Sequence, residues 1–281
     1  MEVFVTKANG SRQLFNKEKI IQTCLRMGAS IYVANEAAEH IERKLYDGIN
    51  TQMILQMIFQ YMRKYKPAIR NLFDLRRGIS IMEPKPEFEM FVQILLSHSG
   101  FEVKSNQILK GKCSEHEVDG LAKKDGITYF VEAKHHFNYH ALTGIDESRI
   151  ARAILEDVNE GFTLGTTNLR IDRALIVINT RYSEKAIEYG TCRNILQIGW
   201  NSPQYLGIKD MVEKGKLYPL SCLRELRNTT RTKLVNSGIV LIKQLLDQNT
   251  FTLAKNTELT KDAALELMEN AKASARTLWE F

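Results

Sequence analysis

The sequence has little that would place it in a membrane or outside the cell. None of its apolar runs approaches the roughly 20 residues needed to cross a bilayer. The first residues lack the basic stretch followed by an apolar one that is typical of a signal peptide. The four cysteines stand far apart, without a C-x-x-C pair, so the sequence indicates neither a zinc ribbon nor a disulfide framework. We therefore expect a protein of the reducing cytoplasm with no membrane partner.

The composition also excludes a mainly disordered chain. Hydrophobic residues make up 44% and charged residues 26% of the 281 residues, which is ordinary for a globular protein. A rough prior of about 100–200 residues per domain predicts two or three domains, long enough to bury cores. No internal repeat or low-complexity tract is visible.

The net charge of +6 is distributed unevenly along the chain. Residues 1–82 hold 13 lysines and arginines against 7 acidic residues, a balance of +6. Residues 83–215 hold 16 against 19, and residues 216–281 hold 10 against 7, which gives −3 and +3. Two basic ends suit an anionic partner such as nucleotide or nucleic acid. An ordinary solvated surface is the alternative, because the total charge is modest.

Prolines and glycines indicate where the chain divides. Pro84 and Pro86 end a long helical stretch, because proline restricts the residue before it. Gly215 and Pro219 bracket a change from a sheet-like pattern to a purely helical one. We therefore expect three domains, over residues 1–82, 83–215 and 216–281.

The first segment predicts a β-hairpin followed by helices. An Asn9-Gly10 pair lies between two short apolar stretches, and Asn-Gly favours a tight turn with positive φ. Asn16 can cap a helix that begins at residue 17. Further helices are expected at 33–46 and at 51–65, the second capped by Thr51.

The middle segment alternates helices and strands, which predicts an α/β domain with a mixed sheet. Gly100 should end its first helix, and Ser183 should cap a later one. A turn at 123–126 joins two of the strands. Helices are expected at 88–97, 147–160 and after 183, and strands at 101–109, 115–122, 127–133, 174–179 and 195–198.

The last segment predicts an all-α domain. Helical periods are present at about 220–227, 230–235, 239–247 and 260–277. Asn236-Ser237-Gly238 predicts a tight turn between two of these helices.

Charged residues stand out in the strands of the middle segment. Glu132 and Lys134 project from one face of a strand, since alternate residues share a face. If this strand pairs with the previous one across the turn, Asp119 comes close to Glu132. Two carboxylates can hold Mg²⁺, which prefers oxygen ligands, and the metal activates a bound water and neutralises charge on a phosphate. A lysine beside them can position that water or stabilise the pentavalent phosphorus, so the set suits phosphodiester hydrolysis.

The alternative is a surface hairpin with a simple ion pair between Glu132 and Lys134. The preceding residues, Tyr129-Phe130-Val131, are apolar, and charges are scarce in such strands unless they are used. Glu89, on the helix that opens the segment, is placed to reach the same metal. The context therefore favours a functional set of charges.

With these residues the middle segment resembles the PD-(D/E)XK nuclease superfamily, and within it the Mrr-like restriction endonucleases and archaeal resolvase-like nucleases. The resemblance covers about residues 85–205 and implies a restriction-endonuclease-like α/β/α domain. It implies that Asp119 and Glu132 bind the metal, that Lys134 is the catalytic lysine and that Glu89 is the helix acid. The matching stretches are Phe88-Glu89, Leu95-Leu96, Gly100-Phe101, Glu117-Val118-Asp119-Gly120, Val131-Glu132-Ala133-Lys134, Asn179-Thr180-Arg181-Tyr182-Ser183 and Ile198-Gly199-Trp200.

The segment departs from this family at several positions. Val118 stands where many members have proline, which is a tolerated change. The Gln-x-x-x-Tyr helix motif of many Mrr-like enzymes is absent after Lys134, which leaves the close subfamily and the DNA target open. Glu117 shares the face of Asp119 and is either a second ligand or a neighbour.

Three histidines follow the lysine, at positions 135, 136 and 140. Adjacent residues of a strand face opposite ways, and no cysteine accompanies these histidines. We interpret them as a polar rim of the site or a DNA contact rather than as zinc ligands.

The first segment resembles the ATP-cone, the nucleotide-sensing domain of ribonucleotide reductases and their repressor. The resemblance covers about residues 3–65 and implies ATP or dATP as an effector. It implies that Lys7 meets phosphate, that Gln13 and Asn16 lie near the base or hairpin, and that Lys19 and Thr51 line the pocket. The matching residues are Val5-Thr6-Lys7, Gly10, Phe15, Lys19-Ile20 and Tyr46-Asp47-Gly48-Ile49-Asn50-Thr51.

The ATP-cone pattern is incomplete. The arginine that usually follows the lysine is Ala8 here, and a histidine expected one turn after Thr51 is Leu55. Arg12 is the candidate to compensate. A retained fold that serves as an interaction module is the alternative to nucleotide binding.

The last segment resembles paired helix-hairpin-helix elements, which direct backbone N–H groups and lysines at DNA phosphates. Leu234-Val235-Asn236-Ser237-Gly238-Ile239 would form one hairpin, and Leu259-Thr260-Lys261-Asp262-Ala263-Ala264 would begin a second unit. The usual Gly-x-Gly is missing. A plain helical packing or dimer module is the alternative.

Two functions follow from these features. The first is a DNA endonuclease that depends on Mg²⁺ or Mn²⁺, carries a nucleotide-sensing domain and binds DNA through its last domain. The second is a non-catalytic, nucleotide-responsive DNA-binding regulator that has kept a nuclease fold. The complete set of two acids and a lysine favours the enzyme. A homodimer is an expectation from symmetry alone, because cutting both strands favours one.

Overall fold

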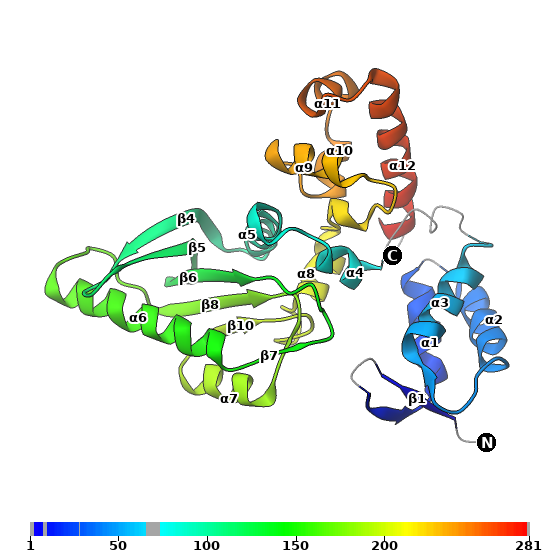
Figure 1. Ribbon diagram of the computed structural model, residues 1–281, viewed down its shortest axis with the longest axis horizontal. Coiled ribbons are helices and arrows are strands. Elements are labelled where there is room, and N and C mark those ends of the chain that lie inside the picture. Colours follow the sequence, from blue (N-terminus) through cyan, green and yellow to red (C-terminus); the bar gives the residue numbers. More distant parts are fainter. Residues whose placement is uncertain (1–2, 8–9, 28, 66–73, 280–281) are drawn as a thin grey trace. The chain divides into compact units, whose positions relative to one another are not determined.

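Figure 1 shows a computed structural model of the chain, which describes residues 3–7, 10–27, 29–65 and 74–279. The chain divides into two compact units. One unit consists of residues 75–221 with 238–241, and the other of residues 1–74, 222–237 and 242–281. The middle of the sequence thus forms one unit, and the two ends contribute the other.

The middle unit is built on a five-stranded mixed sheet with the strand order β10-β8-β6-β5-β4. β10, β8 and β6 run parallel, whereas β5 pairs antiparallel with both β6 and β4. The expected mixed sheet is therefore confirmed. The strands are β4 (Glu102–Lys110), β5 (Glu115–Lys124), β6 (Ile127–Lys134), β8 (Arg173–Ile178) and β10 (Leu196–Ile198).

The turn between β5 and β6 sets the register of these two strands. Asp125 and Gly126 have φ values of +50° and +78°, as a tight two-residue hairpin turn requires. Lys124 is consequently paired with Ile127. The neighbouring β8 is a continuous apolar run, which suits a central strand covered on both faces.

Helices cover both faces of the sheet (Figure 1). α5 (Glu89–His98) contacts β4 and β5, whereas α6 (Asp146–Leu164) contacts β8 and β4 on the other side. The core beneath α6 includes Phe130 and Leu155, both buried. The other elements of this region are α4 (Leu75–Ser80), a turn at Pro84–Phe88, β7 (Leu142–Thr143), β9 (Arg181–Tyr182), α7 (Glu184–Cys192), α8 (Ile208–Gly215) and a 3-10 turn at Leu220–Cys222.

Local signals account for two helix ends in this unit. Ser183 caps α7, since its side chain accepts a hydrogen bond from the backbone N–H of Ala186 at 3.2 Å. Gly100, with φ of +86°, follows α5 as expected. α8 and the β7–β9 pair were not expected. They are short, and the two-residue strands β7 and β9 are defined by pairing with each other rather than by a periodic sequence pattern.

The N-terminal part contains the expected hairpin and helices. Its sheet has the order β2-β1-β3, in which β3 was not expected because it is only two residues long. Gly10 has φ of +80° in the hairpin turn, whereas Asn9 and Ala8 lie outside the described residues. The elements are β1 (Phe4–Thr6), β2 (Arg12–Leu14), α1 (Lys17–Arg26), α2 (Ile31–Glu42), β3 (Ile49–Asn50) and α3 (Thr51–Met62).

Two helix caps were predicted here, and one was wrong. Asn16 caps α1, with its side chain accepting from the N–H of Glu18 at 2.9 Å. Thr51 does not cap α3, because it is already the first helical residue. Asn50, in an extended conformation, accepts from the N–H of Gln52 at 2.8 Å and takes that place.

The described part of the C-terminal region after residue 241 is helical. The helix expected at 220–227 was wrong, since that stretch has only the 3-10 turn. A helix at Thr250–Thr257 was missed, because it ends at Glu258 with φ of +54° and not at a glycine. The helices are α9 (Asn228–Asn236), α10 (Ile242–Leu246), α11 (Thr250–Thr257) and α12 (Lys261–Trp279). Of the helices among the described residues, none combines the length and apolar character of a membrane span.

Candidate active site

β5 and β6 separate where the predicted carboxylates lie. The ladder between these strands runs from Lys124↔Ile127 to Gly120↔Val131. One step further the register places Asp119 opposite Glu132. At this point a side-chain hydrogen bond takes the place of the backbone hydrogen bonds between the strands, since Asp119 Oδ2 accepts from the N–H of Ala133 at 2.7 Å. The carboxylate is thus held against the backbone of the strand that carries the other charges.

Neighbouring elements hold Asp119 from two further sides. The side chain of Gln93, on α5, donates to its carbonyl oxygen at 3.3 Å. On the other side Gly120 allows β4 to approach closely. A Cβ atom at Gly120 would lie 2.8 Å from the carbonyl oxygen of Lys104. The position of Asp119 therefore depends on a glycine that the sheet geometry requires.

Glu89 lies in the first turn of α5 and is buried. Its Oε1 is 3.0 Å from Nζ of Lys85, and the same nitrogen is 3.5 Å from Oδ1 of Asp119. Burial raises the pKa of Glu89, and the charge of Asp119 raises it further, while Lys85 opposes the shift. α5 thus brings a third carboxylate to the end of the sheet.

Glu132 and Lys134 form the second half of the site. Glu132 Oε2 lies 3.2 Å from Lys134 Nζ, and the two side chains are 12% and 41% exposed. Burial raises the pKa of Glu132. Burial alone would lower the pKa of Lys134, but Glu132, then Glu147 and Asp119, raise it on balance. Lys134 is therefore an ammonium at neutral pH.

The structure brings together the four residues expected at the site, Glu89, Asp119, Glu132 and Lys134. Sequence reasoning missed Lys85 and Glu147. The i,i+4 spacing of Lys85 and Glu89 was a signal for the first. No local signal pointed to Glu147, at the start of α6, because its proximity to Lys134 arises from packing. Glu117 is exposed.

The histidines after Lys134 support the loop that follows β6. His135 Nε2 lies 3.0 Å from the carbonyl oxygen of Ile79, and its ring packs edge-on against Phe88 and Phe137. Burial lowers the pKa of His135. His136 bonds through its backbone to Asn179 and through its ring to Thr143. Their described contacts therefore anchor the loop rather than reach the carboxylates, which differs from the expected polar rim.

The donor set suits a hard divalent cation with few protein ligands. Oxygens of Glu89 and Asp119 converge on one positive charge, the ammonium of Lys85. Among the described residues, no three histidine, cysteine or acidic side chains are grouped closely enough to hold a metal by themselves. Mg²⁺ commonly uses one or two carboxylates and completes its shell with water and phosphate oxygens. The residues present fit that mode of binding.

The residues expected to bind nucleotide are distributed over the hairpin, α1 and the start of α3. Lys7 lies in the hairpin turn and Lys19 on α1, and both are exposed. Arg12 forms an ion pair with Asp47 and lies over the ring of Phe4. The N–H of Phe4 and the Arg12 ion pair hold the pKa of Asp47 below its usual range. Gln13 lies on β2, Asn16 is used as a cap, and Thr51 begins α3.

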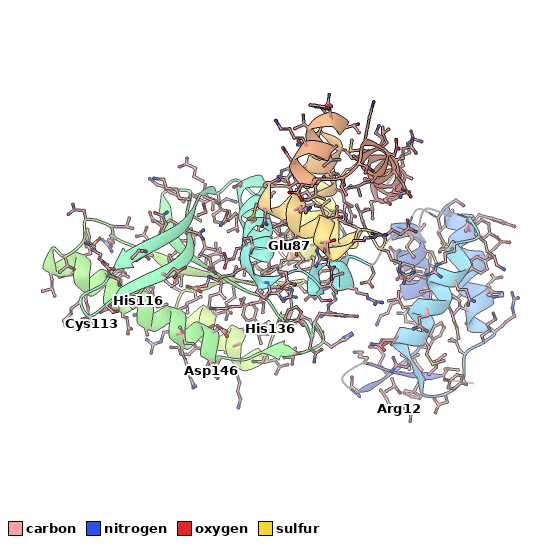
Figure 2. All side chains as sticks on the ribbon, turned by 45° about the horizontal axis from the view of Figure 1, so that its top comes forward. Arg12, Glu87, Cys113, His116, His136 and Asp146 are labelled. Atoms are coloured by element: carbon pink, nitrogen blue, oxygen red, sulfur yellow. The ribbon has the colours of Figure 1, made fainter. Side chains whose placement is uncertain are left out.

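A second polar cluster lies at the start of β5, around His116 and the preceding Cys113 (Figure 2). Asp157, on α6, accepts from the N–H groups of Cys113 and Ser114 and lies 2.7 Å from His116 Nε2. These bonds, led by His116, hold the pKa of Asp157 well below its usual range. A Cβ at Gly111 would overlap Asp157 at 1.9 Å. The cluster therefore ties the β4–β5 connection to α6.

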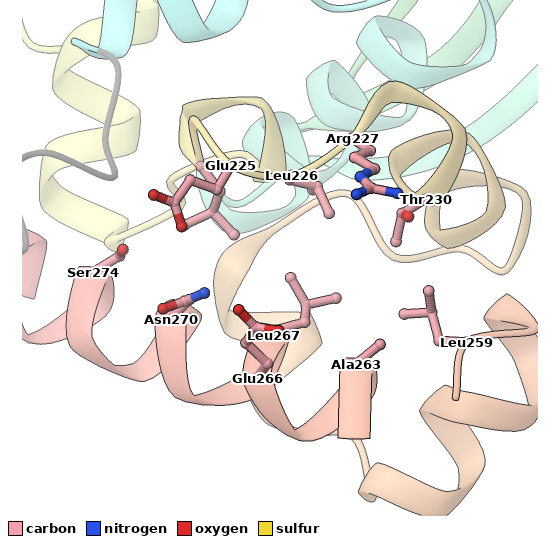
Figure 3. Close-up of a pocket in the computed structure, with 11 residues that line it drawn as sticks. Glu225, Leu226, Arg227, Thr230, Leu259, Ala263, Glu266, Leu267, Asn270 and Ser274 are labelled. Carbon is pink, nitrogen blue, oxygen red and sulfur yellow. The ribbon is translucent and has the colours of Figure 1, made fainter. Parts of the chain in front are cut away.

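The C-terminal helices form a groove of about 310 Å³ (Figure 3). Glu225, Asn270 and Ser274 lie at one end, and Arg227 and Thr230 lie at the other. The Ser274 hydroxyl is buried and makes no hydrogen bond within the described part of the chain. The groove thus combines polar ends with an apolar lining, formed by Leu223, Leu226, Leu259, Ala263 and Leu267.

Comparison with known proteins finds similarity over a large part of the chain. Residues 81–198 match the family model of the Mrr catalytic domain, described as restriction endonuclease. An uncharacterized protein of Archaeoglobus fulgidus is 34% identical over 179 residues, which are 63% of this chain and 96% of that protein. The crystal structure of the protein of unknown function AF1548 is 31% identical, with a TM-score of 0.58, over 66% of this chain and 96% of that one.

Proposed function

Because the chain belongs to the same family as the Archaeoglobus protein and contains a restriction endonuclease-like domain at residues 81–198, we propose that it is a metal-dependent DNA endonuclease. The observation that carries this proposal is the convergence of Asp119, Glu132 and Lys134 where β5 and β6 separate. Glu89 adds a third acid from α5. The set supplies the groups that hydrolysis of a phosphodiester needs.

Each residue has a chemical task in this proposal. Asp119 and Glu132 would hold Mg²⁺ or Mn²⁺, which when bound lowers the pKa of a coordinated water and neutralises charge on the phosphate. Lys134 stays protonated and orients the attacking water or stabilises the pentavalent phosphorus. Glu89 would add a third negative charge to the site from the first turn of α5.

We extend the proposal to the two ends of the chain. Lys7, Arg12, Gln13, Asn16, Lys19 and Thr51 would form the site of an ATP-cone-like domain that takes ATP or dATP as effector. The C-terminal helices would bind DNA phosphates in the manner of helix-hairpin-helix elements, since α9 and α10 are joined by a turn containing Gly238 with φ of +83°. A homodimer in the cytoplasm is the assembly we expect.

One observation favours a second function, a nucleotide-responsive DNA-binding regulator without catalysis. Lys85 places a cation against Glu89 and Asp119, so the carboxylates are partly neutralised without metal. A nuclease fold kept for binding alone would tolerate such a contact. The two functions differ in whether the protein cuts DNA.

Cleavage of supercoiled plasmid and of a branched DNA tests the proposal. The protein is incubated with Mg²⁺ or Mn²⁺, with and without ATP or dATP, beside Asp119→Ala and Lys134→Ala. We expect metal-dependent cutting that falls by about 100-fold or more in both variants. Glu102→Ala is the matched control, since this exposed acid on β4 is not among the candidate site residues and should keep wild-type activity.

The other outcomes separate the two functions. Tight DNA binding without cleavage under any condition would contradict the endonuclease proposal and favour the non-catalytic regulator. Equal cutting by wild type and Asp119→Ala would remove these residues from the reaction. A change of rate with ATP or dATP would assign the nucleotide a regulatory role.

A further inference from the structure

Lys85 is a second lysine at the carboxylate cluster, and the proposed reaction gives it no task. Its Nζ lies 3.0 Å from Oε1 of Glu89 and 3.5 Å from Oδ1 of Asp119. The Lys85 side chain is 65% exposed, whereas those of Glu89 and Asp119 are 8% and 12% exposed. One solvent-facing amine thus contacts two largely buried carboxylates from different elements.

The two oxygens of Asp119 are used differently. Oδ2 accepts the N–H of Ala133 and is fixed by the backbone of β6. Oδ1 is not bound to the backbone of β6 and faces Lys85, so we assign it to the metal ion. The side chain of Glu89 also hydrogen-bonds to the Asp119 carboxylate. A divalent cation bound at Oδ1 would lie close to the ammonium of Lys85, which is 3.5 Å from the same oxygen. The two positive charges would repel each other.

An ordinary surface ion pair does not explain this arrangement. An i,i+4 ion pair of Lys85 with Glu89 does not require the contact between Lys85 and Asp119. Exposed ion pairs of this kind also contribute little to stability. Two nearly buried carboxylates disfavour each other's charge, and a cation beside both relieves this repulsion. The long, exposed lysine side chain can also withdraw into solvent without a backbone movement.

We propose that Lys85 is an internal cation that holds Asp119 Oδ1 in the free protein and competes with the divalent metal for it. This inference rests on the proposed function, because it presumes a metal site at Asp119. Lys85 is then a residue that sets the metal affinity, without touching the reacting phosphate. The affinity of the site for the metal is therefore lower than it would be without Lys85.

Calorimetric titration of the full chain with Mn²⁺, in the absence of DNA, tests the competition. We expect Lys85→Met to bind Mn²⁺ about 3- to 10-fold more tightly than wild type, where tenfold corresponds to about 1.4 kcal/mol. Lys85→Arg keeps the charge and should keep the wild-type affinity. Lys123→Met is the matched control, because it removes the same charge from an exposed site on β5. Asp119→Asn should abolish binding.

The outcomes separate this inference from the proposed function. If Asp119-dependent binding is present but Lys85→Met binds equally or more weakly, with an unchanged thermal melt, the competition is wrong and the metal site stands. Equal tightening in Lys123→Met would also overturn it, as a general charge effect. Binding by Lys85→Met but not by wild type supports it. Absence of binding in both proteins overturns the inference together with the metal site.

Discussion

At the scale of single residues, burial decides what the charged and polar groups near the sheet can do. One oxygen of Asp119 accepts a hydrogen bond from the N–H of Ala133, and the other faces the ammonium of Lys85. Lys134 remains protonated because neighbouring carboxylates outweigh its burial. His135 is the opposite case, since burial outweighs its hydrogen bond to Ile79 and lowers its pKa. The pKa values of Lys134 and His135, adjacent in sequence, are thus shifted in opposite directions.

The titration of His135 should appear in the pH dependence of stability. An unfolded histidine has a pKa of about 6.5, and the folded value is lower. Between these two values the unfolded chain binds a proton that the folded chain does not, so the free energy of unfolding falls as the pH falls through this window. Above about pH 6.5 the contribution is complete.

His135→Phe is expected to reduce this slope, because phenylalanine keeps the ring contacts with Phe88 and Phe137 but cannot titrate. Its stability at pH 7.5 should be lower than wild type, since Ile79 loses a hydrogen-bond partner. Thermal melts of both proteins between pH 4.5 and 7.5 measure the difference. An unchanged slope in His135→Phe would show that other groups cause the pH dependence. His98→Gln, at an exposed histidine, should behave as wild type.

At the scale of elements, the candidate site lies where the pairing of β5 and β6 ends. The antiparallel ladder stops at Gly120↔Val131, and the parallel pairing of β6 with β8 continues to Lys134↔Ile178. β6 is therefore held from one side while its other edge opens toward Asp119. On that edge the N–H of Ala133 bonds to the side chain of Asp119 in place of a backbone partner.

Gly120→Ala tests this packing. The added Cβ would meet the carbonyl oxygen of Lys104 at 2.8 Å, and a backbone atom cannot move aside easily. We expect a loss of about 1–3 kcal/mol in stability. Urea unfolding followed by tryptophan fluorescence and circular dichroism measures it. Gly144→Ala is the control, because its Cβ would meet no atom within 4 Å, and equal losses in both variants would contradict the argument.

The start of α3 gives a second prediction at this scale. Asn50→Ala removes the side chain that accepts from Gln52, so it should destabilise the helix by about 1 kcal/mol. Thr51→Ala removes no cap and should have a smaller effect. Hydrogen exchange of the amides of residues 52–58 reports on the helix directly. Faster exchange in Thr51→Ala than in Asn50→Ala would reverse the assignment.

At the scale of the whole molecule, charge is segregated along the sequence. The middle of the chain, residues 83–215, is slightly acidic at −3, whereas residues 1–82 carry +6. The nucleotide site that we propose lies in the first, basic segment. Its function can be tested independently of the carboxylate cluster.

The double variant Lys7→Ala with Lys19→Ala should weaken ATP binding by about tenfold or more, because two charge-assisted bonds to phosphate are lost. Asp119-dependent Mn²⁺ binding should stay unchanged. Calorimetric titration with ATP and then with Mn²⁺ measures both. Lys44→Ala is the control, since this exposed lysine is outside the expected site. Unaltered ATP affinity in the double variant would favour the interaction-module alternative.

Local patterns were sufficient for much of the α/β domain. The strands around 115–122 and 127–133 were expected because the Asp125-Gly126 turn and the apolar residues act over a few positions. Glu132 and Lys134 share a face for the same local reason, the period of a strand. α11 was missed because its end at Glu258 takes a left-handed conformation without a glycine.

The sequence by itself therefore determined the five strands of the main sheet and the helices α5, α6 and α7. It also determined the tight turns, and the acidic and basic residues that would meet if two strands paired. Only the tertiary structure decided that Lys85 reaches Asp119, 34 positions away, and that Asp157 reaches His116, 41 positions away. Turns and caps depend on backbone preferences over a few residues. Contacts between distant residues depend instead on how buried faces pack and on which strand ladder ends where, as at Gly120 and Asp119.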